Sequence, residues 1–390
     1  AHLVVLCNTC RYIAGGFKEY SQMDVLQMAG RAGRPQFDTS GTCVVMCRAE
    51  QSQVYRKMLA GECTIESELQ KQLPAHLNSE IASQLYMSST EAAAQWLRAT
   101  YLFARVRKNP ARYGIVRGLA ESELEGRLVA LCANKLRELA DSGMIEMTDD
   151  PARGGASRVR PRNLGYLMAR FCVEMETMTL FPQLSATASL PDVLSLLSTS
   201  KELGGGLALR TIDKKPLAAI NASEEKIRFP IDGSRKSKCK TPASKAFLLL
   251  QLRASGAPLE GFDDTRILMQ EKGCRVLRAM IEYAESAGLS GPLCAAVRLH
   301  KSLSSGAGWH DAPTAAFRQF TGVGAQTAAR LSEASQGSLQ AFGQLTSLRV
   351  DQVAPRASSH LAEARTLLRS ELRLVADVER AGPSREGGGG

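Results

Sequence analysis

The chain has 390 residues, of which 44% are hydrophobic, 5% aromatic and 23% charged, a composition typical of globular proteins. This length is more than a single hydrophobic core usually holds, so we expect two to four domains. No run approaches about 18 consecutive apolar residues and no leader pattern opens the chain, which excludes a readable membrane span or secretory signal and favours a soluble intracellular protein. The 49 basic and 39 acidic side chains leave a net charge of +10, which favours a polyanionic partner such as nucleic acid.

Two short apolar runs mark the first region. Residues 2–7 and 42–47 are rich in β-branched side chains, which is typical of strands in a parallel sheet covered on both faces. Between them Ser21 is a suitable helix N-cap, and we expect the helix to end at Gly33. The order predicts the trailing part of an α/β lobe over residues 1–63, so the first residue is not expected to be a natural terminus.

The next region has the pattern of a winged helix. Residues 91–106 and 123–143 repeat apolar side chains at three and four positions, which predicts helices. Residues 144–150, a glycine-rich turn and residues 157–162 then predict a short two-stranded wing. We therefore predict a winged-helix domain over residues 64–165.

The remainder is predicted to be mostly helical. Residues 190–200 and 243–255 are two of the helical stretches that suggest a bundle over residues 166–312. A further helical segment is expected over residues 313–376, and the glycine-rich residues 377–390 are expected to form a flexible tail. The predicted fold class is mostly α and multidomain, with a partial α/β lobe at the front.

The ten cysteines are irregularly spaced, which suits a reducing compartment better than a disulfide scaffold. Cys7 and Cys10 have the spacing of half a zinc site, but Cys7 ends an apolar run, and Cys43 and Cys47 flank another. Buried free thiols are the favoured interpretation and a metal site the alternative. The five histidines form no ligand pattern, so no metal site is predicted.

The stretch QMAGRAGRP, residues 27–35, carries two arginines, Arg31 and Arg34, at i and i+3. Both guanidinium groups can project from one helix edge beside glycines that leave room for a bulky anion. Planar, permanently charged forks suit a transferring phosphoryl group, whose charge spreads over three oxygens. The alternative is a basic helix end whose positive charges interact favourably with the helix dipole. Forks turned into solvent, or tied to carboxylates away from a cleft, would count against the phosphate role.

Residues 21–38 resemble motif VI of superfamily 2 helicases of the Ski-two-like branch, and residues 2–16 resemble its motif V, with Thr9 in the place of the threonine. The two motifs stand in the right order about twenty residues apart. The resemblance implies that Arg34 is an arginine finger and Arg31 its companion, and that Thr9 couples nucleotide to nucleic acid. It also implies that Gln27, Gly30 and Gly33 border ATP.

Similarity to the meiotic crossover-promoting DNA helicases of this branch continues through segments such as WLRATYLFARVRKNPARYG and IRFPIDGSRK. It implies the end of a second RecA-like lobe, a winged helix, a Sec-type helical ratchet bundle and a helix-hairpin-helix. It further implies a nuclear, ATP-dependent helicase that uses Mg²⁺, binds single-stranded or branched DNA and needs no membrane. Two alternatives stay open, an RNA helicase of the same branch and a non-catalytic nucleic-acid-binding scaffold.

One departure from the family limits what these residues do alone. No G-x-x-x-x-G-K-[ST] loop occurs, and no strand ends in paired carboxylates that would hold magnesium. We expect a first lobe, preceding residue 1 in a longer protein, to bind most of the ATP and Mg²⁺. The 390 residues are then inactive by themselves, and a non-enzymatic relic is the other explanation.

Three segments are candidates for gripping nucleic acid. Residues 262–286 predict a long amphipathic helix with Arg275 and Arg278 on one edge, which in the family corresponds to the ratchet helix. Many relatives place a tryptophan beside the second arginine, where this chain has Ala279, so base stacking is in doubt there. The alternative is a solvated charged edge.

The second segment, residues 226–245, is a dense basic run that includes Arg235, Lys236 and Lys238. We expect an exposed loop that meets phosphates, with a merely solvated loop or a basic targeting signal as alternatives. In the third segment, Gly322 and Gly324 resemble the turn of a helix-hairpin-helix, which brings backbone N–H groups to a DNA phosphate. An ordinary helix start is the alternative.

Overall fold

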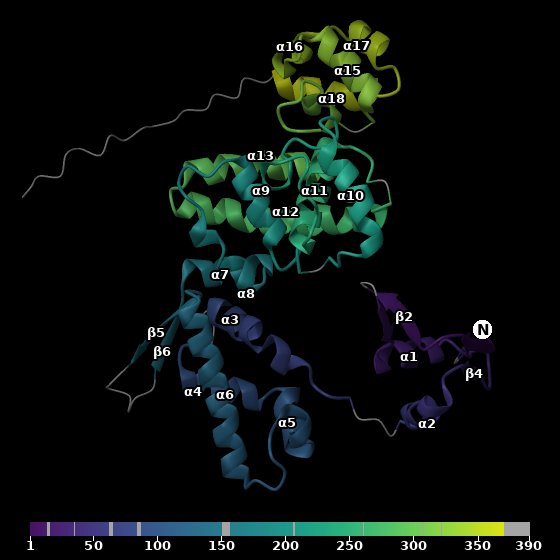
Figure 1. Cartoon of the computed structure of the whole chain (residues 1–390), viewed down its shortest axis with the longest axis vertical. Coiled ribbons are helices and arrows are strands. Elements are labelled where there is room, and N and C mark those ends of the chain that lie inside the picture. Colours follow the sequence, from purple (N-terminus) through teal and green to yellow (C-terminus); the bar gives the residue numbers. More distant parts are fainter. Residues whose placement is uncertain are drawn as a thin grey trace, which may run out of the picture. The chain divides into compact units, whose positions relative to one another are not determined.

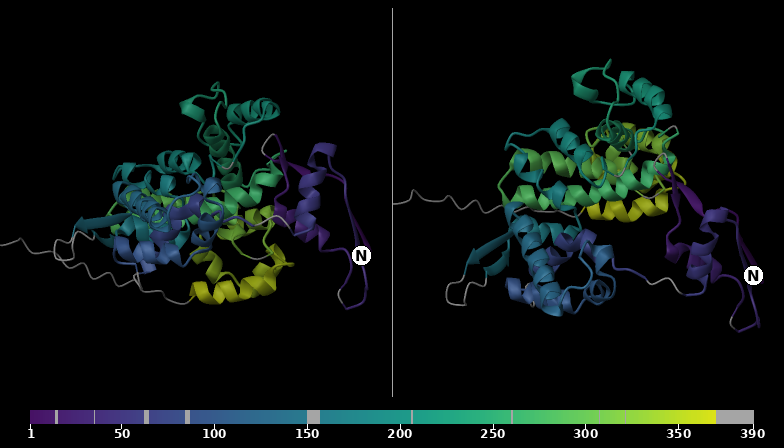
Figure 2. Two further views of the ribbon diagram at one scale, coloured as in Figure 1. Left: turned by 90° about the horizontal axis from the view of Figure 1, so that it is seen from below. Right: turned by 60° about the horizontal axis from the view of Figure 1, so that its bottom comes forward.

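The structure is a computed structural model that describes residues 1–13, 16–34, 36–61, 65–83, 87–149, 157–205, 207–259, 261–306, 308–320 and 322–369. The chain divides into two compact units, residues 1–253 with 257–304, and residues 254–256 with those from 305 onward. Coiled ribbons dominate both units (Figures 1 and 2). The mostly α, multidomain prediction is confirmed.

The first region is a small α/β fragment. Strand β1 (Leu3–Leu6) pairs in parallel with β4 (Thr42–Val45), and helices α1 (Gln22–Ala29) and α2 (Ser52–Leu59) belong to the same region. Their shared core is built on Leu6, Val25, Tyr55 and Met58. The predicted strand, helix, strand order is confirmed. A hairpin of β2 (Cys10–Ile13) and β3 (Gly16–Glu19) was not predicted.

Only one face of the parallel sheet is covered. Leu3, Val5, Val44 and Met46 are between 43% and 56% exposed. The prediction of two covered faces is wrong for this chain, because its described helices supply apolar side chains to one face only. Cys7 is exposed as well, which corrects the prediction of a buried thiol there.

The winged helix has the predicted order with one break. Its helices are α3 (Leu73–Ser83), α4 (Thr90–Arg98), α5 (Tyr101–Lys108) and α6 (Glu121–Asp141), and its wing pairs β5 (Ile145–Asp149) with β6 (Ser157–Pro161). Residues 91–106 are two helices rather than the single one predicted. The Thr100 hydroxyl accepts a hydrogen bond from the Phe103 N–H and begins the second helix.

The helical bundle follows directly. Its helices are α7 (Asn163–Phe171), α8 (Met175–Met178), α9 (Leu190–Thr199), α10 (Lys214–Ala222), α11 (Pro242–Ser255), α12 (Arg266–Ser286) and α13 (Ser290–Ser305). Asn78 of the winged helix donates to the Gly165 carbonyl at 2.8 Å. A Cβ at Gly165 would stand 2.1 Å from the Met144 carbonyl oxygen, so this junction requires glycine. The junction therefore joins winged helix and bundle by close backbone approach.

The second unit consists of five short helices. They are α14 (Ala315–Arg318), α15 (Ala325–Ala334), α16 (Leu339–Gln344), α17 (Ser347–Val353) and α18 (Ser358–Arg369). Phe317, Leu331, Phe342 and Leu361 are fully buried in its core. The predicted tail, residues 377–390, lies outside the described residues. Of the helices that the structure does describe, none is long and apolar enough to cross a membrane.

Candidate nucleotide and nucleic-acid sites

The two arginines of the motif-VI stretch, Arg31 and Arg34, lie in the loop that follows helix α1. A capping box starts α1, with the Ser21 hydroxyl accepting from the Asp24 N–H and the Asp24 carboxylate accepting from the Ser21 N–H. The helix ends at Ala29, so the prediction that Gly33 ends it is wrong. Gly30 caps the helix, and Gly33 serves the next turn with a φ of +80°. Arg31 and Arg34 therefore project from a loop rather than from one helix edge.

Backbone contacts hold this loop in place. The Gly33 N–H donates to the Ala1 carbonyl at 2.6 Å. The Arg34 N–H donates to an Asp38 carboxylate oxygen at 2.8 Å, and the Asp38 N–H returns a bond to the Arg34 carbonyl. Asp38 is nearly buried, so its carboxylate is committed to shaping the loop.

The Arg34 side chain is 65% exposed and only loosely tied. Its Nε lies 3.4 Å from Asp38, and its guanidinium carbon lies 5.0 Å from the centre of the Phe37 ring. Arg31 is exposed, and no hydrogen bond or ion pair holds its side chain within the described residues. Both side chains are turned into solvent and Arg34 is loosely tied to Asp38, so among the described residues this arrangement counts against a phosphate role. Both terminal nitrogens of Arg34 remain available for an anion.

The remaining motif residues lie on both sides of this fragment. Gln27 is exposed on α1. Thr9 is 5% exposed, and its hydroxyl faces the Tyr55 phenol. Burial raises the pKa of Tyr55 on balance, although the hydrogen bond to Thr9 lowers it. Thr9 thus contacts Tyr55, a residue of the core of this region.

The long amphipathic helix predicted over residues 262–286 is present as α12, over Arg266–Ser286. Val276, Leu277 and Met280 are fully buried, as the amphipathic pattern predicts. Arg278 is exposed, whereas Arg275 is half-buried, and its Nε has no hydrogen-bond partner among the described residues. Ala279 is fully buried, so this position offers no surface for a base.

His300 on α13 lies near Arg278 at the exposed edge of α12. Burial lowers the pKa of His300 on α13, and the charge of Arg278 lowers it further. His300 is therefore neutral near pH 7 and adds no charge of its own. Arg278 is therefore the charged group at this edge of α12, where α12 and α13 bury mainly apolar side chains.

The predicted basic loop is divided between structural and exposed side chains. Arg235 is half-buried and donates to the carbonyls of Ser223 at 2.8 Å and Ile227 at 3.3 Å. It therefore holds the loop and is not free to meet a phosphate, which corrects the prediction. Lys236 and Lys238 are exposed, as expected.

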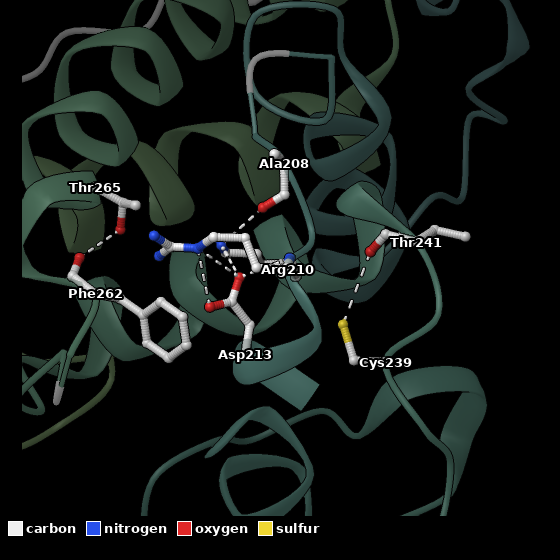
Figure 3. Close-up of polar contacts among 8 residues, drawn as sticks. Ala208, Arg210, Asp213, Cys239, Thr241, Phe262 and Thr265 are labelled. Carbon is white, nitrogen blue, oxygen red and sulfur yellow. Dashed lines mark hydrogen bonds and ion pairs between the residues drawn. The ribbon is translucent and has the colours of Figure 1, made fainter. Parts of the chain in front are cut away.

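Lys245, at the other end of this run, is buried in an ion pair that the sequence did not predict. Its Nζ lies 2.7 Å from an Asp213 oxygen and 3.0 Å from the Ala208 carbonyl oxygen. Figure 3 labels Asp213 and Ala208. Burial raises the pKa of Asp213, but bonds from Lys245 and the Arg210 backbone lower it by more. A buried lysine needs a carboxylate, and no local pattern indicates which one it finds.

The second unit places the two predicted glycines at a helix start. Gly322 has a φ of +78°, and Gly324 is the residue that precedes α15, with open space around its Cα. Val323 between them is buried in the core. Among the described residues no heavy atom lies within 4 Å of a Cβ built at Gly324, which is compatible with an anion site and equally with an ordinary helix start.

The sequence did not indicate a carboxylate that accepts four hydrogen bonds from three side chains. Glu66 accepts hydrogen bonds from Arg105 at 2.9 and 3.1 Å, Asn109 at 2.8 Å and Tyr113 at 2.8 Å. The Tyr113 hydroxyl in turn accepts from the Ser67 N–H at 2.8 Å. These contacts attach the segment that enters the winged helix. They span about forty residues, so helical periodicity contains no signal for them.

Two protein-family models match this architecture. The model of the Sec63 Brl domain matches residues 161–377, and that of a winged helix-turn-helix domain matches residues 66–149. The chain belongs to the Sec63 Brl domain family, preceded by a winged helix.

Three relatives show which helicases the chain is similar to. The chain is 35% identical over 287 residues to the probable ATP-dependent DNA helicase HFM1 of Xenopus tropicalis, which covers 73% of the chain and 21% of the relative. It is 32% identical over 370 residues to the ATP-dependent DNA helicase MER3 homolog of Oryza sativa subsp. japonica, 91% of the chain and 30% of the relative. The DExH-box ATP-dependent RNA helicase DExH14 of Arabidopsis thaliana is 29% identical over 317 residues, 80% of the chain and 14% of the relative.

These matches confirm the resemblance to HFM1 and MER3 helicases, with other Ski-two-like helicases as more distant relatives. The chain spans less than a third of the length of each of the three relatives named above.

Proposed function

We propose that the chain is the C-terminal part of an ATP-dependent DNA helicase that translocates on single strands and unwinds duplex or junction DNA. The names of the HFM1 and MER3 relatives support a DNA helicase. The observation that carries the proposal is the similarity to the MER3 homolog over 91% of the chain. Arg31 and the terminal nitrogens of Arg34 are exposed, so a phosphate role requires a facing lobe that encloses them. A nuclear role in meiotic recombination and crossover formation is proposed on the resemblance of the sequence.

In this proposal the chain completes a nucleotide site that it does not form alone. ATP with Mg²⁺, held mainly by a preceding lobe, supplies the phosphoryl group and its charge. Arg34 and Arg31 would neutralise the γ-phosphoryl oxygens from the facing side, with Gln27, Gly30 and Gly33 bordering the nucleotide. The bare sheet face at Leu3 and Val44 fits a lobe that continues beyond these residues.

Nucleic acid would be gripped at the other predicted sites. Arg278 presents a charge on α12, Lys236 and Lys238 present charges before α11, and Gly324 opens a backbone N–H site in the second unit. Such contacts bind phosphates without reading bases, as translocation along any sequence requires.

The test uses the full-length enzyme with saturating single-stranded DNA. Arg34→Ala should lower ATP turnover by about 10³-fold while strand binding is kept, since an arginine finger is worth that much or more. Arg278→Ala should keep turnover and lower the number of base pairs opened per ATP. Arg56→Ala, an exposed arginine on α2, is the matched control and should change neither quantity. Near-normal turnover of Arg34→Ala would refute the finger role.

Two alternatives have specific support. The likeness to the RNA helicase DExH14 favours an RNA substrate, and a clear preference for RNA duplexes in unwinding would replace the DNA assignment. The absence of a phosphate-binding loop from the 390 residues favours a non-catalytic scaffold. ATP turnover by the full-length protein, with none by these 390 residues alone, separates the scaffold from the enzyme.

A further inference from the structure

A hollow on the helical bundle combines an aromatic floor with a basic rim. It has a volume of about 460 Å³ and is lined by Phe229, Phe247 and residues of α9 and the first turn of α11. A second hollow of about 690 Å³ is lined by Lys236, Lys238 and Lys240. Both hollows are lined by Asp232, Thr241 and Ser244, so they form one continuous groove, which we call the lysine-rimmed groove.

Buried polar side chains hold the floor of this groove. The Gln251 side chain is fully buried, accepts from the Phe229 N–H at 2.8 Å and donates to the Phe229 carbonyl at 2.9 Å. Asn221, also fully buried, donates to the carbonyls of Ser234 and Ser237 and accepts from the Ile231 N–H. Fully satisfied buried amides rigidify the segments that they bridge. The groove is therefore a preorganised surface rather than a loose loop.

A buried residue also anchors the segment that carries the three lysines. Cys239 is 5% exposed, and its Sγ lies 3.8 Å from the Thr241 carbonyl oxygen (Figure 3). Lys236, Lys238 and Lys240 are exposed, so exposed and covered residues alternate along this segment. Lys236 lies in a turn closed by the Ser237 N–H and the Ser234 carbonyl, and Lys238 and Lys240 follow it. The three lysines make no ion pair with any carboxylate that the structure describes.

The floor and the rim differ in chemistry. Phe229 and Phe247 are half-buried aromatic groups, and the Arg228 guanidinium carbon lies 5.7 Å from the centre of the Phe229 ring. Asp232 and Asp192 line the same hollow, and Asp192 accepts from the Ser189 N–H at 2.8 Å. An acidic peptide bound in this hollow would lie next to these carboxylates and be repelled by them. A single nucleic-acid strand has neutral bases, whose amino groups donate to carboxylates, and anionic phosphates on its other side.

We propose that the lysine-rimmed groove holds unpaired DNA, with bases against Phe229 and Phe247 and phosphates on Lys236, Lys238 and Lys240. The proposal rests on the proposed function, since it takes a chain that handles single DNA strands as its premise. To the contact of Lys236 and Lys238 proposed above it adds Lys240 and an aromatic floor for the bases, away from helix α12. Bases engage the aromatic floor by stacking, so the groove binds single strands in preference to duplexes.

The first test measures binding of a fluorescent thymidine homopolymer to the 390-residue chain without nucleotide. In the double variant Lys236→Ala/Lys238→Ala, the slope of log affinity against log salt should fall by about 1.4, since each single-strand phosphate contact contributes about 0.7. Lys214→Ala/Lys215→Ala on α10 removes two exposed lysines from the same bundle and should leave the slope unchanged. An unchanged slope in the first variant overturns the proposal.

The second test needs no variant. A strand that carries 5-iodouracil is crosslinked to the chain, and the attached peptides are mapped by mass spectrometry. Crosslinks at Phe229 or Phe247 are expected, and crosslinks confined to other segments overturn the placement of bases. Polyglutamate that displaces the strand as well as unlabelled DNA does would assign the groove to acidic peptides. Tighter binding of the matching ribonucleotide homopolymer would overturn the choice of DNA.

These measurements are independent of ATP turnover. If Arg34→Ala keeps near-normal turnover while the two lysines carry the salt slope, the finger role fails and the groove stands. If turnover behaves as expected and the slope does not change, the groove alone is refuted.

Discussion

Replacing Glu66 by glutamine removes one charge from the segment that enters the winged helix and keeps the size of the side chain. Hydrogen bonds from Arg105 and Asn109, and a weaker one from Tyr113, lower the pKa of Glu66 from its usual 4.5 to about 2, against a smaller rise from burial. The carboxylate is 15% exposed, so solvent screens these bonds little. A shift of this size corresponds to about 3 kcal/mol of stability at pH 7.

The sign of the pH dependence follows from the lowered pKa. The folded state favours the ionised carboxylate, so its contribution is complete above the usual pKa of 4.5 and is lost as pH falls toward 2. Glu66→Gln should therefore cost about 3 kcal/mol at pH 7 and less than half of that near pH 3.

The assay is urea unfolding followed by tryptophan fluorescence. The chain has two tryptophans, so a Trp309→Phe background leaves Trp96, on α4, as a reporter of the winged helix. Glu68→Gln is the matched control, because Glu68 is exposed and paired only with Lys71 at the surface, and no measurable change is expected. An equal cost of Glu66→Gln at pH 7 and pH 3 would refute the electrostatic reasoning.

Two further changes test the interior of the bundle and the arginine loop. Lys245→Met leaves Asp213 buried without its main partner and should lower the free energy of unfolding by about 3 kcal/mol, whereas Lys245→Met with Asp213→Leu should regain most of it in thermal unfolding. A single cost that the double variant does not relieve would argue against the ion pair as the cause. Gly41→Ala places a Cβ 2.6 Å from the backbone that leads to Arg34, so ATP turnover of the full-length enzyme should fall toward that of Arg34→Ala. Gly126→Ala, where a Cβ meets nothing within 4 Å, should leave turnover unchanged, and equal turnover in both variants would contradict the steric argument.

Several elements could be predicted because their signals are local. The capping box at Ser21, the long helix that carries Arg278 and the two-stranded wing after Gly143 depend on residues within a few positions of one another. The motif-VI spacing likewise places Arg31 and Arg34 together by residue order alone. Helix ends were less predictable, as the end of α1 at Ala29 and the break at Thr100 demonstrate. Each depends on which backbone N–H and carbonyl groups find a partner.

The sequence by itself determined the charge balance, the order of elements and the motifs by which the chain resembles Ski-two-like helicases. Only the tertiary structure decided how individual charges are used. Arg235 and Lys245 belong to the same basic run as Lys236, yet the first two are bound to carbonyls and to Asp213 while the third is exposed. Desolvating a charge is costly unless a partner is present. The partner of Lys245, Asp213, stands 32 residues earlier in the chain, a separation that no local pattern encodes.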